Sequence, residues 1–167
     1  MSNLESIDTL SAVLISELLA AGKLVSTAES CTGGWIAKSL TDNSGSSGCF
    51  GYGLVSYSNS AKESLLGVNP ATLKHYGAIS EAVVKEMAEG ALNLSGADIA
   101  AAVSGVAEPK GSTEEKPVGT VWFAWATRNK NKSNIYTEKR LLKGERDQIR
   151  AQTVIIALQG IREHIRE

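Results

Sequence analysis

The stretch KLVSTAESCTGGWIAKSLTD, residues 23–42, decides the fold class. Its first part, KLVSTA, is short and rich in residues that favour β-strands. Its last part, GGWIAKSLTD, carries Trp35, Ile36 and Leu40 at near-helical spacing. A strand, a tight turn and a helix in this order are typical of α/β folds.

The alternation of helices and strands continues on both sides of this stretch. FGYGLVSYS and ADIAAAVSG predict strands, MSNLESIDTLSAVLISELLAAG predicts an amphipathic helix, and SAKESLLG predicts a short helix that ends at Gly67. The segment AISEAVVKEMAEGALNLSG predicts a longer helix with Ser80 as its N-cap and Gly96 at its end. Another helix is expected from about Glu145.

The segments VGTVWFAWAT and SNIYTEKRLL flank the turn-prone RNKNK, which predicts an antiparallel hairpin. A loop rich in Gly, Pro, Lys and Glu precedes it, from Gly105 to Pro117. We therefore expect residues 1–167 to form a single three-layer α/β/α domain, in which helices cover both faces of a mixed sheet.

Composition excludes several classes of function. The 17 Lys and Arg and 18 Asp and Glu give a formal charge of -1 with no long block of one sign, so nucleic acid is not an expected partner. No apolar run reaches the roughly 18 residues of a membrane span, and no signal peptide is predicted. Two cysteines and two histidines offer neither a disulfide framework nor a metal cage. We expect a cytoplasmic protein without metal or cofactor.

The loop TAESCTGG, residues 27–34, lies where α/β folds bind ligands, between a strand and a helix. Gly33 would let backbone amides approach an anion, and Thr32 would cap the helix. Ser30 would be a nucleophile at a sharp turn, although the Gly-x-Ser-x-Gly pattern is absent. The loop matches no phosphate-binding fingerprint, so a capped turn without a ligand is an equally open interpretation.

A second group of candidate residues lies in SGSSGCFGYGLVSYSNSAKES, residues 44–64, which holds Ser47, Tyr57, Asn59 and Lys62. Lys62 falls in the first turn of its predicted helix, where the helix dipole disfavours a cation. A neutral lysine can accept a serine proton if its pKa falls well below the solution value of about 10.4. On these residues alone, a solvated lysine beside loop serines is the simpler interpretation.

Other nucleophiles and bases have weaker support in the sequence. His75 and His164 lie away from the candidate loops, and Cys31 has no obvious base, so a thiol mechanism is a minor alternative. Backbone amides after Gly105 could hold an oxyanion. Arg146, near the start of the last predicted helix, suits a phosphate through its planar guanidinium.

Several stretches taken together resemble the CinA C-terminal-domain family. They are TAESCTGG, GSSGCFGYGLVSYSNSAK, GAISEAVVKEMAEGA, SGVAEPKGSTEEKPVGTVWFA and GERDQIRAQ, and they cover nearly the whole chain in order. The amino-terminal domain of full-length CinA has no counterpart in this sequence. The resemblance implies a stand-alone α/β/α domain that hydrolyses the carboxamide of nicotinamide mononucleotide to nicotinate mononucleotide and ammonia.

The resemblance also implies roles for individual residues. Ser47 matches the nucleophile and Lys62 its base, with Ser30 and Tyr57 assisting and Arg146 in the binding site. The substrate phosphate is expected against amides near Thr32 and Gly33 or against Arg146. Asn59 is expected to contact substrate, and the amide of Gly105 to stabilise the oxyanion. No metal is implied, and a homodimer is expected.

One loop departs from the family pattern. Where the family usually reads Ser-Gly-Ile-Ala-Gly-Pro-x-Gly-Gly, this chain has SGVAEPKGS, so Glu108 and Ser112 replace glycines. An anion here would restrict the loop or repel a phosphate, and a glycine with positive φ would be lost. The alternative function is therefore a catalytically degenerate paralogue that binds the nucleotide. A DNA-related role, suggested by the competence association of the family name, lacks the required charge pattern.

Overall fold

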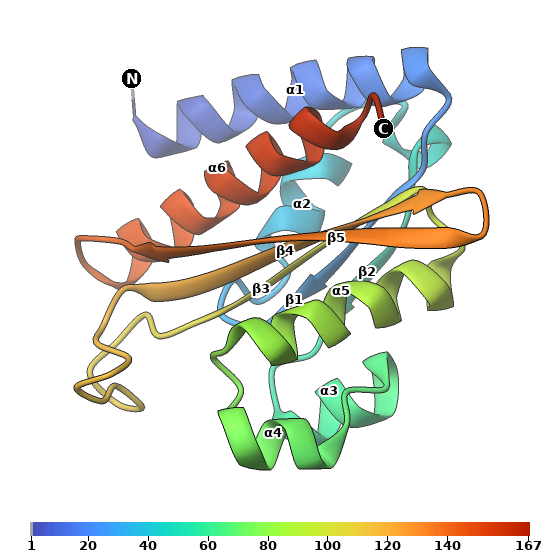
Figure 1. Ribbon diagram of the computed structural model, residues 1–167. Coiled ribbons are helices and arrows are strands. Elements are labelled where there is room, and N and C mark those ends of the chain that lie inside the picture. Colours follow the sequence, from blue (N-terminus) through green and yellow to red (C-terminus); the bar gives the residue numbers. More distant parts are fainter. Residues whose placement is uncertain (1) are drawn as a thin grey trace.

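The computed structural model describes residues 2–167, which form a five-stranded mixed sheet with helices on both faces (Figure 1). The strands are β1 (Val25–Glu29), β2 (Phe50–Val55), β3 (Ile99–Gly105), β4 (Thr120–Asn129) and β5 (Lys132–Leu141), arranged in the order β2-β1-β3-β4-β5. The first three strands run parallel, and β4 and β5 are antiparallel to their neighbours. The predicted α/β class and mixed sheet are confirmed.

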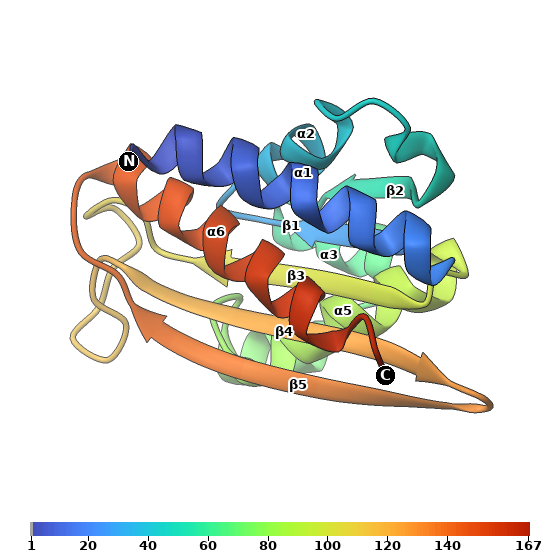
Figure 2. The same cartoon turned by 90° about the horizontal axis from the view of Figure 1, so that it is seen from above.

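Helices lie on both sides of the sheet. On one side lie α1 (Asn3–Ala21), α2 (Trp35–Thr41) and α6 (Arg146–His164), and on the other lie α3 (Asn59–Leu66), α4 (Pro70–Tyr76) and α5 (Glu81–Ser95). Figure 2 shows α1 and α6 side by side across the sheet, with β2 at one edge and β5 at the other. This arrangement confirms the three predicted layers.

The two faces of β3 bury residues of different size. Ile99, Ala101 and Val103 belong to the apolar cluster beneath α6, whereas Ala100 and Ala102 belong to the cluster beneath α5. Successive side chains of a strand point to opposite faces, which explains the division. The alanines allow α5 to lie close to the centre of the sheet.

Helix α3, which carries Lys62, is fixed at both ends and along its length. The Ser58 hydroxyl accepts a hydrogen bond from the backbone N–H of Ala61 at 3.1 Å, and Gly67 ends the helix with a φ of 68°. A Cβ atom on Gly90 of α5 would collide with the backbone oxygen of Leu66. Glycine at position 90 therefore permits direct backbone contact between α5 and the end of α3.

Helix α4 and the hairpin turn differ from the sequence-based expectation. Helix α4 was not predicted, although Asn69 at its N-cap and Pro70 at its first position are a standard start signal. The hairpin turn is tighter than the predicted RNKNK, because the strands pair as far as Asn129 and Lys132. Lys130, inside that turn, adopts a φ of 54°.

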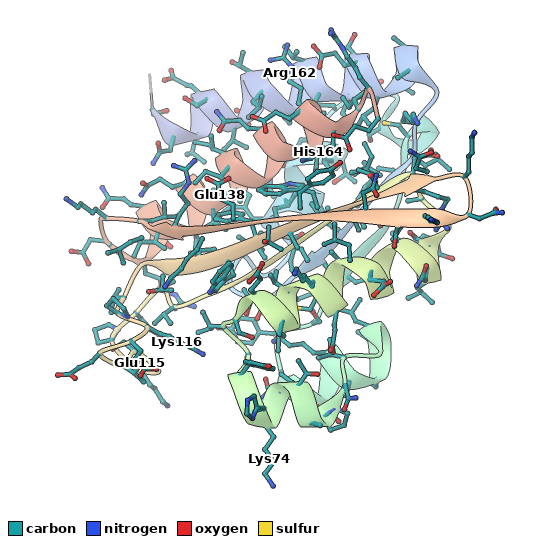
Figure 3. All side chains as sticks on the ribbon, viewed as in Figure 1. Lys74, Glu115, Lys116, Glu138, Arg162 and His164 are labelled. Carbon is teal, nitrogen blue, oxygen red and sulfur yellow. The ribbon has the colours of Figure 1, made fainter. Side chains whose placement is uncertain are left out.

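The loop between β3 and β4 folds back toward the helical layer of α3, α4 and α5. Lys116, labelled in Figure 3, donates a hydrogen bond from Nζ to the backbone oxygen of Tyr76 at the end of α4, at 2.7 Å. This contact anchors the loop at the carboxyl end of β3. Among residues 2–167, no helix combines the length and apolar character that crossing a membrane requires.

Candidate active site

The carboxyl ends of the three parallel strands bring candidate residues from distant parts of the chain to one edge of the sheet. Ser30 follows β1, Tyr57 lies two residues beyond β2, and Gly105 is the last residue of β3. Helix α3 adds Lys62 from the chain that follows β2. Ligand sites of open α/β sheets lie at this edge, so the topology makes these residues a candidate site.

Lys62 is the centre of this group. Only 1% of its surface is exposed, and its Nζ lies 3.1 Å from Ser30 Oγ, 2.9 Å from the backbone oxygen of Ser56 and 3.2 Å from that of Tyr57. Burial lowers the pKa of the Lys62 amine from its ordinary value of 10.5, while the nearby Cys31 acts in the opposite direction. The site thus makes the Lys62 amine easier to deprotonate than a lysine in water.

The two carbonyl contacts determine what a neutral amine can do here. An ammonium has three protons to donate, one for each of the three oxygen atoms around Nζ. After one proton is lost, the oxygens of Ser56 and Tyr57 hold the remaining two. The nitrogen lone pair then faces the hydroxyl of Ser30, which is the arrangement that a general base needs.

The backbone around Ser30 is held on both sides. Its N–H donates to the backbone oxygen of Val103 in β3 at 3.1 Å, and its own carbonyl accepts from the N–H of Gly33 at 3.1 Å. Gly33 has a φ of 61°, a conformation that glycine adopts without strain. The tight turn predicted from the paired glycines is therefore present, and it presents Ser30 to Lys62.

Glu29 supports this turn from inside the protein, and the sequence analysis missed its role. The side chain is fully buried, and it accepts hydrogen bonds from Thr32 Oγ1 at 2.7 Å and from the N–H groups of Ile36 and Ala37 at 2.8 and 3.0 Å. Burial raises the pKa of Glu29, and these hydrogen bonds oppose the rise. An acid at the end of a buried strand, just before a helix, was the available signal.

The predicted capping role of Thr32 is wrong. The N-cap position of α2 is Gly34, which has no side chain to offer, and the Glu29 carboxylate accepts from the second and third N–H groups of the helix instead. The Thr32 hydroxyl donates to that carboxylate, so it serves the cap only indirectly. Since Thr32 is fully buried, its hydroxyl is also closed to a substrate phosphate.

A cavity of about 190 Å³ opens beside Ser30 and Lys62. Its lining includes the predicted residues Ser30, Tyr57, Asn59, Lys62, Gly105 and Arg146, together with Glu108 and Lys110. Arg146 Nη2 lies 3.4 Å from the hydroxyl of Tyr57, and Arg146 Nη1 lies 3.3 Å from Glu108 Oε1. The structure thus brings six of the predicted site residues to one cavity.

Within one chain, Ser47 does not lie beside Lys62. Ser47 is exposed in the short 3-10 helix η1 (Ser46–Gly48), which precedes β2, whereas Lys62 lies beyond the other end of that strand. Phe50 pairs with the first residue of β1 and Val55 with the last, so about 17 Å of strand separates the two ends. Figure 2 shows the segment before β2 at the opposite end of the sheet from the β3–β4 loop.

Gly33 and Thr32 also line a different space from the one expected. With Trp35, Lys38 and Arg150 they border an open hollow of about 720 Å³ between the amino-terminal ends of α1, α2 and α6. Arg150 donates to the backbone oxygens of Cys31 and Thr32 at 3.0 and 3.1 Å. Arg150 therefore holds the outer side of the turn that carries Ser30.

Two chemical questions raised by the sequence are answered by local geometry. Burial raises the pKa of Cys31 to about 12, so its thiol stays protonated at neutral pH and is a poor nucleophile.

Among residues 2–167, Lys130 is the one non-glycine residue with positive φ, so Glu108 and Ser112 occupy ordinary backbone conformations. The two replaced glycines therefore cost this chain no backbone strain.

Comparison with known proteins agrees with this architecture. Residues 7–165 match the CinA C-terminal domain. The chain is 49% identical over 158 residues to the nicotinamide-nucleotide amidohydrolase PncC of Enterobacter agglomerans, covering 94% of each protein. It is 51% identical over 144 residues to PncC of Escherichia coli strain K12, covering 86% of each. A competence/damage inducible protein of Agrobacterium tumefaciens superposes with a TM-score of 0.91 at 41% identity, covering 97% of this chain and 96% of that one.

Proposed function

The chain belongs to the CinA C-terminal domain family, and on this premise we propose that it hydrolyses the carboxamide of nicotinamide mononucleotide to nicotinate mononucleotide and ammonia. One observation carries the mechanism: the buried amine of Lys62 lies 3.1 Å from the hydroxyl of Ser30. In this proposal Ser30 is the nucleophile and Lys62 is the general base.

Acylation begins with Lys62 neutral. Ser30 Oγ attacks the carboxamide carbon, and its proton passes to Lys62 Nζ. The tetrahedral intermediate carries its negative charge on the former carbonyl oxygen. When that intermediate collapses, the C–N bond breaks, Lys62 returns the proton to the leaving nitrogen, and ammonia departs. The product of this half-reaction is an ester between Ser30 and the nicotinoyl group.

Deacylation repeats these steps with water in place of the serine. Lys62 takes a proton from the attacking water, and a second tetrahedral intermediate releases Ser30 Oγ, which recovers that proton. The carboxylic acid formed loses its proton to solvent, and nicotinate mononucleotide leaves as the carboxylate. The carbonyl oxygens of Ser56 and Tyr57 hold the lysine in place through both halves, since they accept the protons that do not move.

We assign the oxyanion contact to the backbone N–H of Gly105. The N–H of Ser30 donates to Val103 on the edge of β3 that faces β1. Alternate residues of a strand direct their backbone groups to the same edge, so the N–H of Gly105 also faces the side on which Ser30 lies. A preorganised amide at this position would stabilise the developing charge. Glycine is required there, because a Cβ atom would lie 2.7 Å from a methyl group of Val121.

Arg146 is the proposed phosphate contact, and Asn59 is a proposed contact for the ribose or the amide. Arg146 lines the cavity beside the hydroxyl of Tyr57, and its guanidinium can offer two parallel N–H groups to a phosphate. Thr32 and Gly33, which face elsewhere, are left out of this assignment.

The second candidate function is a nucleotide-binding paralogue without turnover. Glu108 favours it, because the carboxylate occupies Arg146 at the cavity. The retained contact between Ser30 and Lys62 favours the enzyme, since a protein that only binds gains nothing from a buried lysine beside a serine.

We also propose that the protein acts in the cytoplasm as a homodimer. Strand β2 forms an open edge of the sheet, and its Tyr52 and Val55 are 46% and 45% exposed. Apolar side chains on an unpaired edge are suited to contact with a second copy. Sedimentation at micromolar concentration tests this, and a monomeric mass would contradict it.

The decisive experiment for the enzyme is ammonia release from nicotinamide mononucleotide by the purified protein. We expect ammonia and nicotinate mononucleotide in equal amounts, and no release by a Ser30→Ala variant that remains folded. Saturable binding of the nucleotide without ammonia would select the second candidate. Ammonia release by Ser30→Ala at the wild-type rate would exclude the proposed nucleophile.

A further inference from the structure

An ion pair forms part of the lining of the Ser30 cavity. Glu108 Oε1 lies 3.3 Å from Arg146 Nη1, and both residues line the cavity that contains Ser30 and Lys62. The pair is partly exposed, with 50% of the Glu108 side chain and 40% of the Arg146 side chain accessible. Exposed ion pairs are weak, so another anion can displace the carboxylate from Arg146.

The guanidinium of Arg146 is also connected to the reacting groups. Its Nη2 lies 3.4 Å from the hydroxyl of Tyr57, and the backbone oxygen of the same tyrosine accepts from Lys62 Nζ. A single residue, Tyr57, therefore links the proposed phosphate contact to the proposed general base, through its hydroxyl on one side and its backbone oxygen on the other. Lys110, a second cation of the cavity lining, lies in the same loop as Glu108.

We propose that Glu108 is a specificity-determining residue that competes with the substrate phosphate for Arg146. As a result, this chain binds the phosphate-free nucleoside, nicotinamide riboside, nearly as well as the mononucleotide. The inference rests on the proposed function, because it takes an amide placed at Ser30 as its starting point.

The charges of this ion pair explain the expected preference. A phosphate that takes Arg146 from Glu108 leaves that carboxylate a few ångströms away, where two negative charges repel. A ligand that ends in a hydroxyl leaves the ion pair intact, and a carboxylate accepts hydrogen bonds from hydroxyls. Glu108 thus weakens binding of the nucleotide and leaves binding of the nucleoside nearly unchanged.

The volume of the cavity also favours the nucleoside over the nucleotide. With the ion pair formed, the cavity measures about 190 Å³, below the roughly 300 Å³ at which most ligand pockets begin. A nucleotide would have to open the pair in order to place both its amide and its phosphate, whereas a nucleoside needs less room.

Equilibrium binding separates the affinity of each ligand from turnover. Calorimetric titration of nicotinamide mononucleotide and nicotinamide riboside is carried out on the Ser30→Ala protein, with and without Glu108→Gln. We expect Glu108→Gln to tighten nucleotide binding about tenfold and to change riboside binding less than about twofold. The matched control is Glu115→Gln, which removes the same charge from the same loop, outside the cavity lining (Figure 3). It should alter neither affinity by more than about twofold.

A second pair of variants tests whether the effect of Glu108 on nucleotide affinity depends on Arg146. When Arg146→Gln is already present, adding Glu108→Gln should change nucleotide affinity less than about threefold, since the two anions no longer share a cation. Weaker nucleotide binding in Glu108→Gln, an equal change for both ligands, or no change would overturn the inference. If the Ser30→Ala protein binds neither ligand, the proposed function fails as well. If it binds both and Glu108→Gln has no effect, only this inference fails.

Discussion

The two serine-bearing loops of this protein, at opposite ends of the sheet, look alike in sequence and differ in their surroundings. Ser30 and Ser47 each lie in a short turn that contains glycine. Ser30 is 9% exposed and touches the buried amine of Lys62, whereas Ser47 is exposed on a 3-10 helix beside the end of α1. Two serines in similar local sequence therefore differ in whether the fold places a buried amine beside the hydroxyl.

The largest expected effect comes from replacing each of the two serines by alanine in turn. Ser30→Ala should lower kcat by roughly a thousandfold or more, because the attacking hydroxyl is lost, while Ser47→Ala should stay within about twofold of wild type. Ammonia release measures both rates. Near-normal turnover by folded Ser30→Ala, together with an inactive Ser47→Ala, would reverse the comparison and restore the prediction from the family resemblance.

The second effect tests the base. Lys62→Arg should lose about a hundredfold to a thousandfold in kcat/KM at every accessible pH, because guanidinium keeps its proton. In the wild type, burial lowers the pKa of Lys62 below 10.5, and only the neutral amine accepts a proton. Wild-type kcat/KM should therefore rise with pH and reach a plateau below pH 10.5. A folded Lys62→Arg enzyme with more than about a tenth of wild-type activity would remove Lys62 from the mechanism.

A smaller effect is expected from the support beneath Ser30. Glu29→Gln places an amide N–H₂ group against either the N–H of Ala37 or the two donors that now share Oε1. We expect kcat to fall about tenfold with KM within about twofold, because the turn shifts slightly while the binding groups remain. Glu29→Asp, which keeps the charge, should recover part of kcat. Full activity of Glu29→Gln would show that the cap does not position Ser30.

The smallest effect concerns stability. Because burial lowers the pKa of Lys62 in the folded protein, the unfolded chain binds more protons between that lowered pKa and about 10.4. The free energy of unfolding of wild type, relative to Lys62→Met, should therefore rise with pH across this window. The rise is at most about 1.4 kcal/mol for each pH unit. Urea unfolding from pH 6 to 10 measures it, and a difference that falls with pH would mean that the lysine is folded in its charged form.

Much of this fold could be predicted from local patterns. Ser80 and Gly96 bound α5 as expected, and the apolar spacing of the last helix places Ile149, Leu158 and Ile161 in the core. These signals depend on neighbours along the chain, so the sequence carries them directly. Helix α4 was missed because its start signal is followed by a short, polar segment.

The site was only partly predictable, because its contacts join distant segments. Lys62, Tyr57, Asn59 and Arg146 were assigned to the site and share one cavity. Within the chain the amine of Lys62 contacts Ser30 and not the predicted Ser47, because strand direction decides which serine lies near it, and residue spacing does not report strand direction. The burial of Glu29 and the contact between Glu108 and Arg146 are likewise products of tertiary packing.

The backbone contact between Gly90 and Leu66 has a consequence for how this protein tolerates mutation. Any side chain at position 90 must push the end of α3 away from α5, and Lys62 moves with that helix. A single methyl group between α5 and α3 would thus act on the reaction through the distance between the Lys62 amine and the Ser30 hydroxyl. In a genetic screen for inactive variants, position 90 would therefore be recovered alongside the residues of the cavity, even though Gly90 does not line it.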